Sequence, residues 1–123
     1  MRRALAIALG LTALPSIANA QAVESGYPRG SLAVAAIERG DWARAEALLN
    51  AAQVSRDDPA WLINMGQVYM HTGRQTEALT AWRAALASTR HAEVETLSGR
   101  LLSTRQIARD ALARYETASL AAR

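Results

Sequence analysis

The same residue types recur every 33 residues along this 123-residue chain, and this period constrains the fold more than any other feature. Alanines set the register, and a large apolar residue stands four positions after each of them. The matching positions are Ala45, Ala78 and Ala111; Leu49, Trp82 and Tyr115; Ala52, Ala85 and Ala118; Ala33, Gly66 and Gly99; and Ala36, Tyr69 and Leu102. A period of this length is typical of proteins that stack one supersecondary unit on the next. The units are predicted at 26–58, 59–91 and 92–123.

Each unit is predicted to hold two helices, and the second unit gives the clearest pattern. Asp58 and Pro59 suit a helix start, and Gly73 suits the end of that helix. Apolar residues recur at helical spacing both before and after Gly73. Gly66 and Ala78 fall where the two helices would cross, because only small side chains let helix backbones approach closely.

The second unit resembles a tetratricopeptide repeat. The resemblance rests on Leu62-x2-Met65-Gly66-x2-Tyr69, then Gly73, Ala78-x3-Trp82 and Ala85. It implies an all-α, right-handed α-solenoid of about three antiparallel helix pairs over residues 26–123. In the third unit Gln106 stands where Gly40 and Gly73 stand in the others. That unit is therefore predicted either as a helix pair or as one long terminal helix.

The resemblance also implies a last helix whose outer side is open to solvent or to another chain. Leu112, Tyr115 and Ala118 are expected on its inner side, and Ile107 and Leu120 on an outer apolar strip. Weak self-association through this strip is one hypothesis for the chain.

The first twenty residues have the order of a secretory signal peptide. Arg2 and Arg3 precede an apolar stretch over 4–14, and Ala18-Asn19-Ala20 is a small-residue cleavage pattern. Eleven helical residues reach roughly 16 Å, too short for a hydrocarbon core of ~30 Å. We expect cleavage after Ala20, a short N-terminal segment at 21–25, and no membrane span after cleavage. The expected location is the periplasm, with secretion as the alternative.

Charge argues against nucleic acid as a partner. Removing Arg2 and Arg3 lowers the formal net charge from +3 to +1, and the remaining acids and arginines alternate along the chain. Proteins that bind nucleic acids usually cluster Lys and Arg on one face.

The sequence offers no constellation for catalysis, and we predict a protein that is not an enzyme. Its two histidines, His71 and His91, are interpreted as solvated or loop-capping residues, and Asp57-Asp58 as part of a helix cap. His91-x-Glu93 lacks a further ligand nearby, and the chain has no cysteine, so neither a metal nor a cofactor is expected. Trp42 and Trp82 are expected in the core, whereas Trp61 is predicted either to pack on the second helix of the first unit or to lie partly exposed.

Function is expected in the groove lined by the first helices, which the resemblance implies receives a peptide or a partner helix. The predicted partner-binding residues are Ile63, Asn64, Gln67, Met70, His71 and Arg100. The flanking units would add Val34, Ile37 and Glu38, and Thr96, Ser103 and Thr104. Side-chain amides can bond an extended peptide backbone, and Arg100 could pair with a carboxylate. We interpret the chain as an exported interaction module or scaffold. The alternatives are a non-catalytic regulatory subunit of an envelope enzyme complex and a self-associating structural protein.

Overall fold

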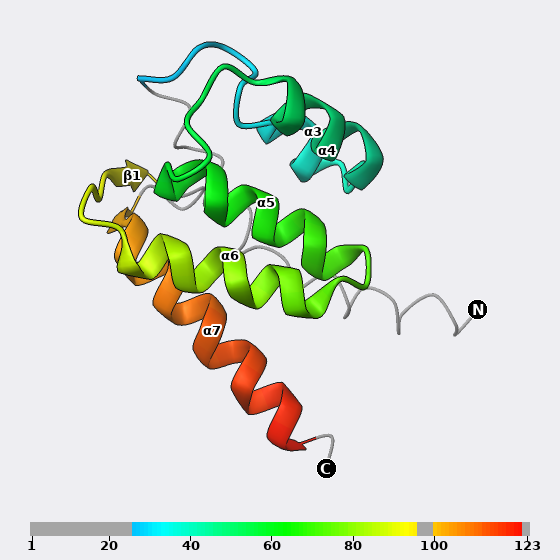
Figure 1. The fold of residues 1–123 in the computed structure, drawn as a ribbon, viewed down its shortest axis with the longest axis vertical. Helices are drawn as coiled ribbons and strands as arrows, with labels where there is room; N and C mark the ends of the chain where they lie inside the picture. The colour runs from blue at the N-terminus through cyan, green and yellow to red at the C-terminus, as the bar shows by residue number, and fades with distance from the viewer. Residues whose placement is uncertain (1–25, 96–99, 122–123) are drawn as a thin grey trace.

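The computed structural model describes residues 26–95 and 100–121, and its architecture is mainly helical (Figure 1). The first repeat holds α3 (Val34–Glu38) and α4 (Trp42–Ala51), and the second holds α5 (Pro59–His71) and α6 (Gln75–Ala87). A short antiparallel pair of strands, β1 (Glu93–Glu95) and β2 (Leu101–Ser103), precedes the long helix α7 (Thr104–Ala121). The helices α5 and α6 run antiparallel, and α7 crosses beside them toward the C-terminus (Figure 1).

Local sequence sets the ends of α5. The Asp58 carboxylate accepts hydrogen bonds from the backbone N–H groups of Ala60, at 2.9 Å, and Trp61, at 3.2 Å, while Pro59 takes the first turn. Beyond the other end, Gly73 adopts φ +80°, which a side chain would disfavour. The N–H of Arg74 then bonds the carbonyl of Tyr69 at 2.8 Å, so the chain reverses into α6. The start and stop signals in the sequence are confirmed here.

The predicted close crossing of α5 and α6 is also confirmed. Gly66 and Ala78 are both buried, and Gly66 faces the indole of Trp82, which is 4 % exposed. The indole N–H of Trp82 donates to the carbonyl of Ile63 at 3.4 Å. The indole therefore takes the space that the missing side chain leaves, with its N–H edge toward the α5 backbone.

One continuous core joins the two repeats to the segment that follows them. It runs from Leu32 and Leu49 in the first repeat through Met65 and Val68 in the second to Ile107 in α7. A smaller cluster between α6 and α7 contains Ala78, Trp82 and Leu112. Because α7 packs against both α5 and α6, it occupies the position next to the second pair where a further repeat would begin.

The third unit is not a helix pair, and that prediction was wrong. Instead of a first helix, β1 and β2 pair with Val94 opposite Leu102, and Val94 is buried. The alternative of one terminal helix was closer, but α7 begins only at Thr104. Its start is a reciprocal cap, in which Ser103 Oγ accepts from the N–H of Gln106 at 3.1 Å and Gln106 Oε1 accepts from the N–H of Ser103 at 3.0 Å.

Ile107 does not lie on the outer apolar strip that was predicted for the last helix. Ile107 is 7 % exposed and belongs to the core, and the side chain of Leu120 lies outside the described part. On the inner side Leu112 is buried and Tyr115 half-buried, its hydroxyl bonding Gln75 Oε1 at 3.1 Å, whereas Ala118 is exposed. Ile107 lies four residues before Ala111 and eight before Tyr115, so the three share one face of α7.

None of the described helices is both long enough and apolar enough to span a membrane. The predicted signal peptide at 1–20 and the segment 21–25 fall outside the described residues, so cleavage after Ala20 stays a prediction.

Candidate partner-binding surface

The five α5 residues predicted to line an open groove divide into two groups. Ile63, Asn64 and Gln67 are 1 %, 0 % and 2 % exposed, whereas Met70 and His71 are half-buried. The expectation of an open surface was therefore wrong for the first three, because α5 lies between its neighbours on both sides. Their role in binding a partner stays a prediction.

The two buried amides have hydrogen-bonding capacity that the described structure leaves unused. Asn64 Nδ2 donates to the carbonyl of Leu32 at 2.8 Å, which ties α5 to the first repeat. Asn64 Oδ1 and Gln67 Oε1 are buried acceptors without a hydrogen-bond partner. Leaving a buried acceptor unpaired costs about 1–3 kcal/mol, so such a pair one helical turn apart on one face is an expensive arrangement for packing alone.

His71 is held at the end of the same helix, where it is the more polar of the two half-buried predicted residues of α5. Its Nδ1 lies 3.0 Å from the carbonyl of Gln67, and its ring stacks on Trp42 at a centroid distance of 4.1 Å and an interplanar angle of 13°. Trp42 is half-buried, and thus lies at the edge of the core. The two stacked rings form a partly open contact between the two repeats, whereas Met70 packs on the cluster of Ala78, Trp82 and Leu112.

Trp61 is buried, which decides between the two alternatives for this residue. Its indole N–H donates to the carbonyl of Leu49 at 2.9 Å, and the residue is 7 % exposed. It therefore packs on the end of the second helix of the first repeat, as one alternative predicted.

The flanking residues predicted for the groove do not gather on one helix face. In the first repeat Ile37 is buried, Val34 half-buried and Glu38 exposed. Arg100 is exposed directly before β2 instead of lying on a helix, Ser103 ends β2, Thr104 begins α7, and Thr96 lies outside the described residues. The β-hairpin is the reason, because it replaces the helix on which these four were placed.

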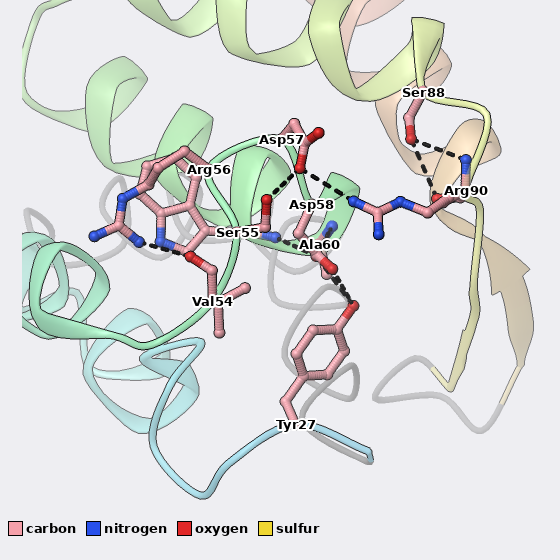
Figure 2. A network of polar contacts seen from close by, with 10 residues as sticks. Tyr27, Val54, Ser55, Arg56, Asp57, Asp58, Ala60, Ser88 and Arg90 are labelled. Carbon is pink, nitrogen blue, oxygen red and sulfur yellow. Dashed lines mark hydrogen bonds and ion pairs between the residues drawn. The ribbon is translucent and has the colours of Figure 1, made fainter.

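A polar network fixes the junction between the repeats at the start of α5 (Figure 2). The hydroxyl of Tyr27 donates to both carboxylate oxygens of Asp58 at 3.0 Å, and Asp58 caps α5. Burial, followed by the negative charge of Asp58, raises the pKa of Tyr27 to about 12. Asp57 pairs with Arg90 at 3.1 Å and also accepts a hydrogen bond from the hydroxyl of Ser55. This network joins the loops that precede α5 and follow α6, and it was not predicted.

A groove on the other side of α5 was also missed by the sequence analysis. It measures about 270 Å³ and lies between α5 and α6. Its lining residues are Trp61, Leu62, Met65, Tyr69, Glu77, Thr80, Ala81 and Ala84. The sequence feature that could have indicated this groove is the set of small side chains at positions 80, 81 and 84, which lie along one side of α6.

His91 takes a structural position at the base of the hairpin. Its Nδ1 lies 3.1 Å from Thr104 Oγ1, which also accepts from the N–H of Ala92 at 3.2 Å. Within 26–95 and 100–121, no group of three or more His, Cys, Asp or Glu side chains could hold a metal ion.

Comparison with known proteins agrees with the helical pairs. The sequence profile described as "Tetratricopeptide repeat" matches residues 36–101, from the middle of α3 to the first residue of β2. No curated protein and no solved structure matches the sequence at a significant level. The match covers more than half of the chain, and the helix pairs with their small-residue crossing agree with it: the chain belongs to the tetratricopeptide repeat family.

Proposed function

We propose that this chain is an exported protein-interaction module that binds an extended peptide or a partner helix along the side of α5 that carries Asn64 and Gln67. Tetratricopeptide repeats present stacked helices as binding surfaces, so family membership implies protein partners. The periplasm is the proposed location, with secretion as the alternative, because the first twenty residues read as a signal peptide.

The unpaired pair of acceptors carries this proposal. Asn64 Oδ1 and Gln67 Oε1 lie on one face of α5, and neither has a hydrogen-bond partner among residues 26–95 and 100–121. Both residues are buried, so a ligand reaches them only when the elements that cover this face of α5 move aside. An acceptor in an apolar surrounding then gains most from a donor that arrives with the ligand, such as the N–H of a peptide backbone. His71, stacked on Trp42, continues this face to the end of the helix, where both rings are half-buried.

The test separates a binding role from a packing role at Gln67. The Gln67→Met variant keeps a side chain of similar length but removes the acceptor. If the amide serves binding, the variant should be at least as stable as the wild type, because an unsatisfied buried acceptor is gone, yet it should bind less partner. Stability is measured by urea unfolding followed by circular dichroism.

Binding is measured by capture from envelope extract on the immobilised chain 21–123, with partners identified by mass spectrometry. Asn64→Ala combined with Gln67→Met should lower recovery of the main partner by about tenfold. The matched control is Asn50→Ala with Gln53→Met, which alters two exposed amides at the same spacing. Equal recovery with both pairs, or a Gln67→Met chain that is less stable and binds normally, would contradict the proposal.

A further inference from the structure

The groove between α5 and α6 lies on the side of α5 that faces away from Asn64 and Gln67. Leu62, Met65 and Tyr69 line it, and at 100° per residue their positions are on the opposite side of the helix from 64, 67 and 71. Whatever occupies the groove therefore need not compete with a ligand on the other face.

The shape of the groove fits side chains of a protein better than a cofactor. Its volume of about 270 Å³ is below the roughly 300–1,000 Å³ of pockets that enclose drug-sized ligands. Met65 is 1 % exposed and forms the floor, while the α6 wall consists of Thr80, Ala81 and Ala84. Such small side chains let a second helix approach α6 closely, and the wall from Glu77 to Ala84 covers about two helical turns.

Two side chains of opposite charge stand at the two ends of the groove: Arg56, which contacts Trp61, and Glu77, which lines the rim. At the Trp61 end, the Arg56 guanidinium lies 4.7 Å from the indole centroid. It donates to the carbonyls of Asn50 and Val54 at 2.8 and 2.9 Å, but it forms no ion pair with any residue in the described ranges. The bond from Arg56 to Val54 and its position beside the repeat junction can be followed in Figure 2.

At the Tyr69 end, the acid on the rim is Glu77, which lies in the first turn of α6 near Arg74. Arg74 lies 4.9 Å from the Tyr69 ring centroid, but its guanidinium is paired with Glu46 at 2.6 Å. Glu77 is exposed and lies in no ion pair among the residues that the structure describes. An apolar channel thus runs from a positive end to a negative one.

We propose that this groove is a second docking site, which binds an amphipathic helix of a partner protein. Large apolar side chains of that helix at i, i+3 or i+4, and i+7 fill the channel over Met65, Trp61 and the small stripe of α6. An acidic residue at one end of the helix faces Arg56, and a basic residue at the other end faces Glu77. This site would let one chain hold two partners, which goes beyond the function proposed for the Asn64–Gln67 face.

The test is photo-crosslinking in the cells that produce the protein, with p-benzoylphenylalanine in place of Ala84. The expected adduct contains a peptide from a partner helix with the apolar spacing and the two charges described above. A synthetic copy of that helix should bind the purified chain 21–123. Ala84→Arg should weaken this binding about tenfold or more, and Glu77→Arg should weaken it until the basic residue of the helix is changed to Glu.

The control is Ala113→Arg, which adds the same charge at an exposed alanine of α7 and should leave binding of the helix unchanged. A photoadduct with a lipid or small molecule, an adduct with a second copy of this chain, no adduct at all, or a helix whose affinity ignores Ala84→Arg would each overturn the proposal. Its failure is distinguishable from failure of the first proposed function, because Gln67→Met should leave binding in this groove intact.

Discussion

Adding a single methyl group at Gly66 should destabilise this protein, although alanine is the better helix former. A Cβ atom built on Gly66 would lie 2.6 Å from Cδ1 and 2.9 Å from Cε2 of Trp82, and closer still to Nε1. Optimal carbon contacts are about 3.5–4.0 Å, so the indole would have to shift by about 1 Å. It is a rigid ring that is 4 % exposed, and it has little room to do so.

The opposing effects differ enough in size to decide the sign. Replacing glycine by alanine inside a helix gains about 0.5–1 kcal/mol, whereas overpacking a core costs about 1–3 kcal/mol or more. Moving the ring also stretches the 3.4 Å bond from Trp82 Nε1 to the carbonyl of Ile63. We expect Gly66→Ala to lower the free energy of unfolding by about 2 kcal/mol, or the melting temperature by about 10 °C for a domain of this size.

The assay is urea unfolding followed by circular dichroism, in a double-mutant cycle with Trp82→Leu. In the Trp82→Leu background the clash is gone, so Gly66→Ala should become neutral or stabilising by up to about 1 kcal/mol. The reversal of sign is the diagnostic result. A Gly66→Ala chain as stable as the wild type, or the same loss in both backgrounds, would refute the close-crossing argument.

Further measurements test the junctions and the leader segment. Hydrogen bonds from Arg74 hold the pKa of Glu46 below its ordinary value of 4.5. This pair therefore stabilises the fold above about pH 4.5, and its contribution is lost as the pH falls through the lower pKa of the folded state. Glu46→Gln should remove that part of the acid sensitivity in urea unfolding, and an unchanged pH dependence would contradict it. The raised pKa of Tyr27 implies a contribution to folding stability that is full below pH 10 and is lost as the pH rises through about 12. Phenolate absorbance should show one such late titration, which Tyr27→Phe abolishes. The same variant should lose about 1 kcal/mol of folding stability, because it lacks the hydrogen bonds to Asp58. Intact mass of the exported protein should match a chain that begins at residue 21, and a mass that includes Met1 would contradict cleavage after Ala20.

The sequence was sufficient for the second repeat because each structural requirement there selects a recognisable residue. A tight turn with positive φ selects Gly73, a backbone contact with an indole selects Gly66, and a helix start selects Asp58 with Pro59. Each of these requirements is met by one or two residues of a particular type, so each can be recognised in the sequence. The family match over 36–101 covers the same part of the chain.

The binding surface was harder to predict because exposure depends on neighbours distant in sequence. Asn64 and Gln67 occupy positions that the helical wheel places on the inner face, yet both are buried, and Asn64 bonds the carbonyl of Leu32 in the first repeat. A wheel gives the direction of a side chain from the axis of its own helix, but not what packs there. The groove at Ala84 was missed for the complementary reason, since the small side chains at 80, 81 and 84 become one wall of a groove only when a neighbouring helix forms the other wall.

The third unit shows how a repeat period can mislead where it weakens. Gln106 was the one position that broke the glycine column, and it is the residue that caps α7 by accepting from the N–H of Ser103. Upstream, Val94 faces Leu102 across the two strands, and Ser98-Gly99 between the strands is a sequence typical of turns. Alanine-rich chains match a spacing such as Ala111 to Ala118 by composition alone, whereas a lost turn glycine followed by a good helix cap has a physical cause. The mismatch therefore carried more structural information than the matches around it: the helix that closes this stack begins at the residue after Ser103, the first half of the cap.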